Sequence, residues 1–458
     1  MRKIYSEKVW SLLSKEDYFI LFVVFFSLKP DGTFPLSKGL SPWCYAIHNI
    51  IFVIACLALI IAGLRAKSKT MSVVRLTFYY LALFMFCLSV NLLNALKFGS
   101  FGYRTSWFGM IILGVLSLPV LASLKMRRFW LCILFLLLLR AGLDMYAIFR
   151  FPLSPERSDM LFAVREAGLR WLRTGVSPYA PIPYKGANLL MPYLPLNFLF
   201  YLPVNLWGWD PRIANGLAHF LAFFLFYSLC RRQGYSPQQI FPYLVGLVLM
   251  PYWIYRHDLY FSLIFVLLII FIAAAQDKKF MWAYGCLLLL ILYRQTLLSV
   301  VPFFLMYHFF STSDKKTFFC EAGTFITLFI GLFMISAWYF PGMIHTTISF
   351  HWEGTVPYAL SFMGCFGSFL PHGPILSRVL QIFSFIVLLI FWGIKFRQCS
   401  SHKLLLASAT SALSTFAFFA PKASNYFYLE AIVILAFLFL ADSSLGPREI
   451  DQKYGTTF

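Results

Sequence analysis

The chain has 458 residues, of which 60% are hydrophobic, 20% aromatic and only 12% charged. A soluble domain could not bury that much apolar surface, so the composition excludes a soluble enzyme and predicts an all-α protein that crosses a membrane many times. The formal net charge of +20 would suggest nucleic acid as the partner of a soluble protein. Here the basic residues cluster in short turns, as in the cytoplasmic loops of membrane proteins, and we expect no nucleic-acid partner.

The nine cysteines form no C-x-x-C pair and have no metal-type spacing. Most of them lie within apolar runs, where a thiol acts as a small hydrophobic group; examples are Cys56, Cys87, Cys132 and Cys286. We expect neither a disulfide framework nor a cysteine metal site. The chain also lacks HExxH and DxD motifs, so the sequence predicts no metal cofactor.

The N-terminal part, 1–128, is predicted to consist of transmembrane helices. After a basic start, the short apolar run 18–28 lacks a small-residue cleavage site, so we expect an uncleaved first span. Longer runs follow at 43–64, 76–96 and 107–124. The run 129–149 opens the second part, 129–458. Counted from a cytoplasmic N-terminus, the chain then emerges on the extracytoplasmic side.

The longest polar interruption is the external loop 150–210. Ser154 is a suitable helix cap and Pro155 fits the first helical position, because its missing N–H is not needed there. Gly175 is a natural C-terminal stop. The sequence therefore predicts a helix over 155–174.

This helix carries an apolar face and a mixed face with Arg165, Glu166 and Arg173. Such a helix is typical of the membrane interface, with its basic side toward water and lipid headgroups. Asp159 lies in the first turn, where the helix dipole favours the ionised form. Stabilisation of the helix start is therefore the simple alternative to a catalytic role.

The segment 189–207 is interrupted by Pro192, Pro195 and Pro203. If it does not span the membrane, every later basic turn falls on the cytoplasmic side, as the positive-inside rule requires. We therefore expect a re-entrant or surface element, followed by spans at 211–230, 240–255, 259–275, 280–293, 297–310, 318–339, 375–394, 404–419 and 426–440. The whole chain then has about 12 to 14 spans, with a second external loop at 341–372.

The external loop resembles a known family. Asp159 heads the interfacial helix, Trp171 to Gly175 leads into Ser177-Pro178-Tyr179, and 191–196 reads Met-Pro-Tyr-Leu-Pro-Leu. This order is similar to the first external loop of GT-C glycosyltransferases, and within them to the polyprenol-phosphate-mannose-dependent α-mannosyltransferases. The last element has one proline where the family pattern often has two. The resemblance covers roughly 158–232 and implies a GT-C-like catalytic module over 129–458.

The resemblance implies an inverting, metal-independent transferase on the extracytoplasmic face of a bacterial inner membrane, with the endoplasmic reticulum as second choice. It would move a sugar, mannose in the closest branch, from a polyprenyl phosphate to a lipid or glycan acceptor. The leaving group is a stable phosphate anion and needs no general acid, so one carboxylate suffices as base for the acceptor hydroxyl. Cations should hold the departing phosphate.

The resemblance makes Asp159 the catalytic base. Cations expected on the outer side are candidates for binding the donor phosphate, namely Arg294, Arg256, His257 and Lys422. Snorkelling to the headgroups or interface anchoring would explain them equally well. Candidates for contacts with the acceptor or sugar are Asp258, Glu353, Tyr179 and Tyr193. Asp258 also fits a helix N-cap, and Glu353 stands where the family tends to have Arg.

Three other interpretations stay open. A multi-span lipid or glycolipid transporter or flippase would show broken helices, preferably in two related halves; the interruption at Arg294 fits, but no internal repeat is visible. A polysaccharide polymerase or ligase would carry a late external loop rich in Arg and His, whereas 341–372 contains no Arg. A non-catalytic subunit of a glycosylation complex is the third.

Overall fold

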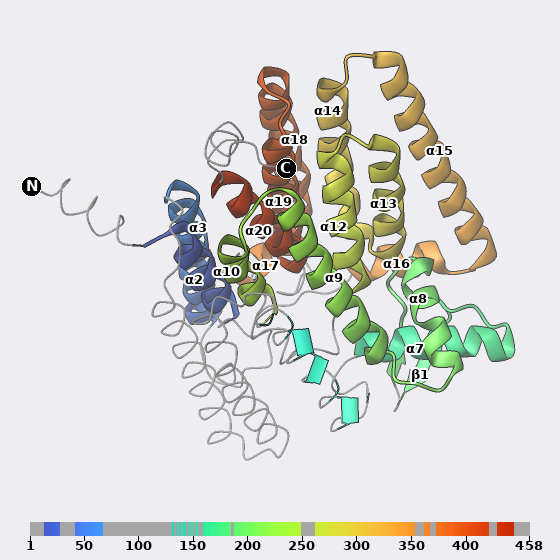
Figure 1. The fold of residues 1–458 in the computed structure, drawn as a ribbon. Coiled ribbons are helices and arrows are strands. Elements are labelled where there is room, and N and C mark those ends of the chain that lie inside the picture. The colour runs from blue at the N-terminus through green and yellow to red at the C-terminus, as the bar shows by residue number, and fades with distance from the viewer. Residues whose placement is uncertain are drawn as a thin grey trace, which may run out of the picture.

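The computed structural model describes residues 13–27, 42–66, 159–184, 187–248, 262–352, 361–366, 372–420 and 428–443, with single positions between 131 and 153. This part of the chain is built from helices and one small β-hairpin (Figure 1). The predicted all-α class is therefore confirmed for the described residues. The predicted spans at 76–96 and 107–124 lie outside them.

The described helices follow the chain on both sides of the external loop. In order they are α2 (Lys15–Ser27), α3 (Pro42–Arg65), α7 (Asp159–Thr174), α8 (Pro195–Leu206), α9 (Arg212–Arg232), α10 (Pro237–Val248), α12 (Leu263–Gln276), α13 (Phe280–Tyr293), α14 (Val301–Ser311), α15 (Lys315–Tyr339), α16 (Met343–Trp352), α17 (Phe362–Phe366), α18 (Gly373–Gln398), α19 (His402–Phe419) and α20 (Leu429–Ser443). A short 3-10 helix, η3 (Gln295–Val300), connects α13 to α14.

A two-stranded hairpin between α7 and α8 was not expected from the sequence. Strands β1 (Ile182–Tyr184) and β2 (Ala187–Leu189) pair antiparallel. The register places Ile182 opposite Leu189, and Lys185 and Gly186 between the strands lie outside the described residues. Prolines flank and enter β1, which hid the strand signal, because proline is tolerated only where a strand needs no N–H donor.

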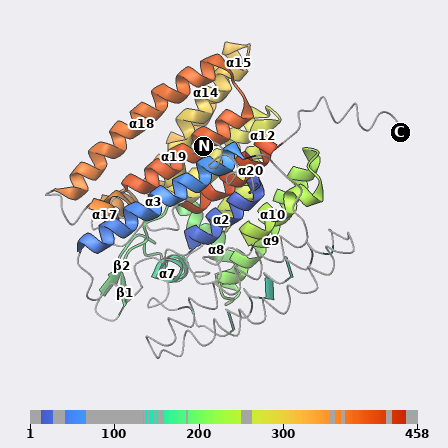
Figure 2. The ribbon, with the colours of Figure 1, turned by 90° about the vertical axis from the view of Figure 1, so that its left-hand side faces the viewer.

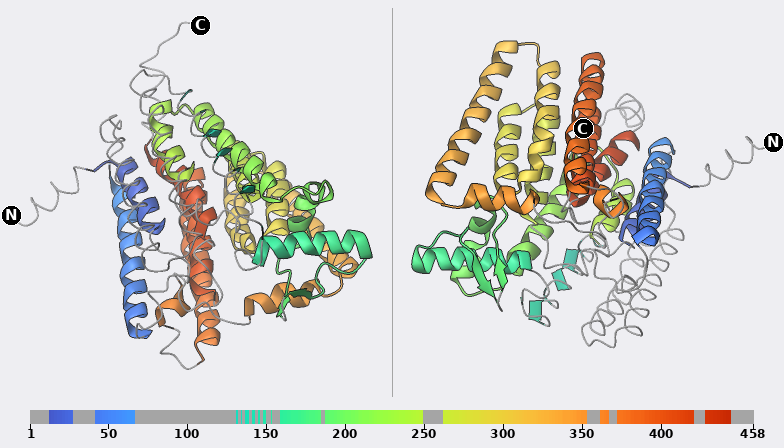
Figure 3. Two further views of the ribbon diagram at one scale, coloured as in Figure 1. Left: turned by 90° about the horizontal axis from the view of Figure 1, so that it is seen from below. Right: turned by 180° about the vertical axis from the view of Figure 1, so that it is seen from behind.

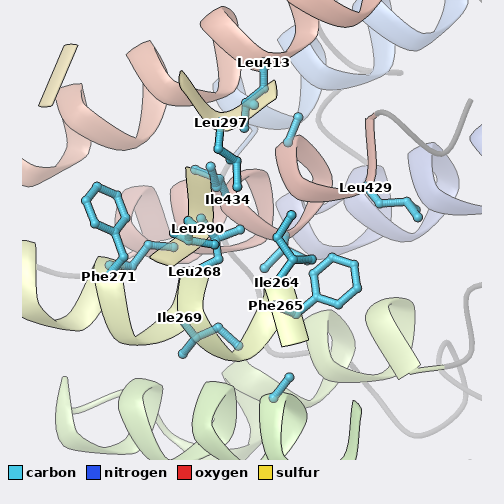
Figure 4. Packing of buried hydrophobic residues seen from close by; sticks show 14 of the residues in the cluster. Ile264, Phe265, Leu268, Ile269, Phe271, Leu290, Leu297, Leu413, Leu429 and Ile434 are labelled. Carbon is cyan, nitrogen blue, oxygen red and sulfur yellow. The ribbon is translucent and has the colours of Figure 1, made fainter. Parts of the chain in front are cut away.

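The core lies around α12, which is apolar on every side. Its side chains pack against α9 and α13, and the first turns also reach α20. Figure 4 shows residues of this core, with Leu268 of α12 close to Leu290 of α13 and Ile434 of α20 nearby. A helix that is hydrophobic all round must be covered by neighbouring helices or by lipid. For α12 and α20 the neighbouring helices provide this cover.

The N-terminal helices belong to the same body. Helix α2 packs against α3 and α10, and both α2 and α3 reach α20 (Figure 2). Nearly all apolar side chains of α2 that the structure describes are buried, among them Phe19, Phe22 and Phe26. The short predicted run 18–28 is therefore an inner helix of this bundle.

Three described helices are long and apolar enough to cross a membrane by length and composition, namely α9, α15 and α18. Only 17% of the apolar window of α15 and 11% of that of α18 are buried within the molecule. Their exposed side chains include Trp338 and Ile375. Such large uncovered apolar surfaces are incompatible with water as their surroundings. The structure is thus compatible with an all-α membrane protein.

The two ends of the bundle differ in character. Figure 1 shows the α12–α13, α14–α15 and α18–α19 connections at one end, and α7 lying across the other end. The first end carries lysines and arginines, and there Arg232 forms an ion pair with Asp277. At the opposite end α7 and α16 lie across the helix axes, as seen from below and from behind in Figure 3. All described basic turns after the external loop therefore share a side.

Gly63 marks the closest approach between α3 and its neighbours. A Cβ at this position would stand 2.5 Å from Cε1 of Phe439 and 2.9 Å from Cβ of Tyr18. We predict that Gly63→Ala destabilises the protein by about 1 to 3 kcal/mol, because the added methyl forces α2 or α20 to move. The matched control is Gly323→Ala, where nothing lies within 4 Å of the added carbon. Thermal unfolding in detergent measures both variants, and equal midpoints would contradict the close packing.

Candidate functional site

Helix α7 begins at Asp159 in the structure and ends at Thr174. Gly175 follows with φ of 70°, and its N–H donates to the carbonyl of Trp171 over 2.9 Å. The predicted stop at Gly175 is confirmed, since only glycine enters this left-handed conformation without strain. Residues 154–158 and the side chain of Asp159 lie outside the described part. The catalytic role of Asp159 stays a prediction.

The apolar face of α7 packs against α8 and an aromatic cluster. The ring of Trp171 lies 5.9 Å from that of Phe198 on α8 and 5.5 Å from that of Phe340 after α15, in edge-on geometries. Phe198 and Phe340 are themselves 5.5 Å apart, and Tyr179 is 6.2 Å from Phe340. Edge-on aromatic pairs add to the stabilisation from burial. The cluster fixes α7 against the bundle.

Arg170 organises the turn after α7. Its guanidinium donates to the carbonyl of Pro181 over 2.8 Å and to that of Ser177 over 3.3 Å, and it also bonds the carbonyl of Ala180. The carbonyl of Ser177 also accepts from the N–H of Ala180 over 3.0 Å. The guanidinium adds a second donor there and bonds the carbonyls of Ala180 and Pro181 as well. Nothing in the sequence indicated this role, because an arginine near a helix C-terminus is also explained by the helix dipole.

The Ser-Pro-Tyr motif holds two external segments together. The hydroxyl of Ser177 donates to the carbonyl of Pro341 over 2.7 Å, at the start of the predicted second external loop. The hydroxyl of Tyr179 donates to the carbonyl of Tyr193 over 2.7 Å. Burial raises the pKa of Tyr179 well above its ordinary value, so the hydroxyl stays a donor. The motif therefore has at least a structural role, because its two hydroxyls hold separate segments of the chain together.

Tyr179 and Tyr193 were predicted to contact the acceptor or sugar. The structure brings them together, but in the interior, with 1% and 4% of their surfaces exposed. A sugar could reach their rings only if this part of the molecule opened. Their part in sugar binding stays a prediction, whereas their part in folding is visible in the hydrogen bond between them.

Arg294 terminates α13 in an extended conformation and forms an ion pair with Glu430 near the start of α20. Only 6% of the Arg294 side chain and 1% of the Glu430 side chain are exposed. A guanidinium so deeply buried does not snorkel to the headgroups, which was the alternative interpretation. Its role in holding the donor phosphate stays a prediction, and any such role includes Glu430 as its neighbour.

Hydrogen bonds connect the turn around Arg294 to helix α8 and to the segment before it. The amide of Gln295 donates to the carbonyl of Pro192 over 2.7 Å, and the amide of Asn197 donates to that of Tyr293 over 3.4 Å. The end of α13 and the start of α8 are thereby joined. The side chain of Gln295 thus holds the proline-rich segment before α8. The carbonyl of Tyr293 can accept from Asn197 because it lies in the last turn of α13, where the carbonyls lack helical N–H partners.

The other predicted site residues lie outside the described part of the chain; they are Arg256, His257, Asp258, Glu353 and Lys422. Their roles stay predictions. Within the residues that the structure describes, no group of three or more His, Cys, Asp and Glu side chains could hold a metal ion. Comparison of the chain with protein-family models, with curated proteins and with solved structures gave no match.

The turn after α7 offers a direct test. We predict that Arg170→Ala lowers the free energy of unfolding by on the order of 1 kcal/mol, because three exposed or partly exposed carbonyls of the turn lose their charge-assisted donors and must bond to water instead. Arg173→Ala, one turn of the same helix away and exposed, is the matched control and should change little. Thermal unfolding in detergent, monitored by tryptophan fluorescence, compares the two. A larger loss in Arg173→Ala would show that helix charge, not the turn, matters.

The buried ion pair predicts a strongly non-additive double-mutant cycle. Arg294→Met should cost about 3 to 5 kcal/mol, because Glu430 is left buried without its cation. Combining it with Glu430→Met should restore much of the stability, since two apolar side chains of similar size need no partner. The exposed pair is the comparison, where Arg232→Met should cost at most about 1 kcal/mol. Additive losses in the Arg294–Glu430 cycle would contradict the pairing.

Proposed function

We propose that the chain is an integral-membrane glycosyltransferase of the GT-C type, with about 12 to 14 spans. It transfers a sugar, mannose in the closest branch, from a polyprenyl phosphate to a lipid or glycan acceptor on the extracytoplasmic face. The observation that carries the proposal is α7, an amphipathic helix that starts at Asp159 and lies across the bundle end opposite the basic turns. This is where a base for membrane-bound substrates is useful.

The sidedness of the bundle supports the placement of the site. Turns rich in lysine and arginine mark the cytoplasmic side of a membrane protein. The α12–α13, α14–α15 and α18–α19 turns share one end, which supports an extracytoplasmic position for α7 at the other end. A polyprenyl chain would lie along the exposed apolar helices α15 and α18, while its phosphate stays at the interface near α7.

The proposed reaction is a single inverting displacement. The acceptor oxygen attacks the anomeric carbon while the bond between that carbon and the phosphate oxygen breaks. The acceptor proton passes to the carboxylate of Asp159, and the polyprenyl phosphate leaves as an anion that needs no proton. Arg294, Arg256, His257 and Lys422 would hold this anion.

The acceptor side of the proposed site has a separate set of residues. Asp258, Glu353, Tyr179 and Tyr193 would position the acceptor and the sugar through hydrogen bonds. No metal is assigned to the reaction, because a phosphate monoester leaves as a stable anion without Lewis-acid help. A bacterial inner membrane, with the endoplasmic reticulum as second choice, is the proposed location.

A transporter is the second candidate function. It is favoured by the interruption between α13 and α14, where the 3-10 helix η3 follows a buried ion pair. Helix α13 has 14 residues, so at a rise of about 1.5 Å per residue it is about 21 Å long and does not cross a bilayer alone. Helices that end in polar groups before they cross the bilayer are also found at the substrate sites of many transporters.

We predict that Asp159→Asn abolishes sugar transfer, because the amide cannot accept the acceptor proton. The assay gives purified protein a radiolabelled polyprenyl-phosphate-mannose donor and a membrane lipid extract as acceptor. Asp210→Asn is the matched control, since Asp210 pairs with Arg212 outside the proposed base position. Equal transfer by wild type and Asp159→Asn would disprove the assigned base.

The transporter is tested in the same membranes. If the protein in reconstituted vesicles translocates the labelled lipid without forming a new glycosidic bond, the chain is a transporter and not a transferase. Sugar transfer without translocation of the lipid would exclude the transporter.

A further inference from the structure

The helices α8 and α9 carry polar side chains on faces that are turned inward. On α8 these are Asn197 and Tyr201, one turn apart, and on α9 they are Asn215 and His219, also one turn apart. All four are buried, with at most 3% of each surface exposed. Residues four apart lie on one helical face. Two apolar helices therefore each present a polar face to the interior.

These side chains form one network with α12 and α13. The hydroxyl of Tyr201 donates to Oδ1 of Asn215 over 2.6 Å and lies 3.1 Å from the hydroxyl of Tyr293. Oδ1 of Asn215 also accepts from the N–H of Ser262 over 3.3 Å, and the hydroxyl of Ser262 lies 3.0 Å from Nε2 of His219. Since Tyr201 gives its proton to Asn215, Tyr293 is the donor in the tyrosine pair.

This direction of donation leaves two amide atoms unused. Asn215 employs Oδ1, and its Nδ2 has no hydrogen-bond partner within the described part of the chain. Asn197 employs Nδ2 toward the carbonyl of Tyr293, and its Oδ1 has none there either. One donor and one acceptor thus remain on two residues of the same buried network. Asn205, one further turn along α8, adds a donor and an acceptor in the same condition.

Unpaired buried amide atoms are costly. Each costs about 1 to 3 kcal/mol when nothing replaces the hydrogen bonds it makes in water. Folded proteins satisfy the large majority of such atoms, with ordered water where protein atoms do not suffice. Asparagine on the buried face of an apolar helix therefore indicates a bound molecule, called the guest below, that forms hydrogen bonds with it.

The chemistry of the guest follows from the atoms available. Among the described residues the site offers amides and phenol hydroxyls, and the neighbouring Arg294 is neutralised by Glu430. An ion would lose its hydration without compensation there. A hydroxyl group both donates and accepts, so it suits Asn197 Oδ1 and Asn215 Nδ2 alike. We propose that α8, α9 and α13 form a site for neutral hydroxyl groups, occupied by ordered water or by the hydroxyls of a sugar.

The two sources have different consequences. Ordered water makes the network a hydrated part of the resting protein, and this holds whether or not the chain is a transferase. If sugar hydroxyls occupy the network, it is the subsite that orients the transferred sugar beneath α7. Only this second case rests on the proposed function. A sugar has several hydroxyls, which matches unpaired atoms on more than one residue.

Radiolytic hydroxyl-radical footprinting tests the proposal on the full chain in lipid nanodiscs. Radicals made from bound water label the side chains beside it even when bulk solvent is excluded. Tyr201 and Tyr293 should be labelled clearly more than two equally buried tyrosines that donate to backbone carbonyls, Tyr179 and Tyr307. Labelling of Tyr201 and Tyr293 as low as that of these controls would overturn the proposal.

Addition of lipid separates the two occupants. Polyprenyl-phosphate-mannose should remove the labelling of Tyr201 and Tyr293 if sugar hydroxyls replace the water, whereas polyprenyl phosphate without sugar should leave it. Retained labelling with both lipids identifies water as the occupant. If the protein transfers no sugar in the assay above while Tyr201 and Tyr293 remain labelled, the proposed function is wrong and the hydroxyl-binding site stands.

Variants give a second, independent readout. Asn197→Leu should lower the labelling of Tyr293 and the unfolding midpoint, because it removes the acceptor that holds the guest. Ser408→Ala is the matched control, since Ser408 is equally buried and its hydroxyl bonds Leu405 of its own helix. An Asn197→Leu protein that is more stable than wild type and labelled as strongly would contradict the site.

Discussion

The ion pair between Arg294 and Glu430 lies where several elements of the bundle meet. It joins the end of α13 to the start of α20, two segments that are 136 residues apart. The neighbouring residues Tyr293 and Gln295 bond to Asn197 and Pro192, so the same point also holds the entry into α8. A buried pair of this kind is expensive to desolvate and rarely increases stability over apolar side chains. We infer that its value here is specificity, because the charges meet only when α13 and α20 pack as they do.

The external segment depends on that arrangement. Helix α8 carries Phe198, which supports Trp171 of α7. Beyond α7, Arg170 gathers the carbonyls of the following turn, and Ser177 bonds to Pro341 on a different external segment. Each contact is modest in energy, but together they leave α7 one position across the bundle end. A proton acceptor at the start of α7 would therefore be held at a fixed distance from the membrane-embedded groups.

The polar network beneath α7 connects these two features. It begins at Tyr293, beside the ion pair, and continues through Tyr201 and Asn215 to Ser262. The groups on this path are neutral, whereas the pair beside it is ionic and the helices around it are apolar. A polar path inside an apolar bundle is retained only if it is satisfied, and the remaining amide atoms require a hydroxyl-bearing guest for that. The buried ion pair, the network of hydroxyl and amide groups, and the amphipathic helix α7 thus lie at one end of the molecule.

The sequence by itself determined the helical class, the stop of α7 at Gly175 and the positions of helices such as α9 (Arg212–Arg232) and α13 (Phe280–Tyr293). These features rest on hydrophobic runs and on caps, which act within a few residues. Tertiary structure alone decided the partner of Arg294, the fastening of Ser177 to Pro341 across 164 residues, and the meeting of Tyr201 with Tyr293 across 92. The hairpin at 182–189 belongs with these, because its prolines gave no strand signal. A side chain's type fixes what it can bond, but its partner is fixed by which helices pack together, and that depends on the whole bundle at once.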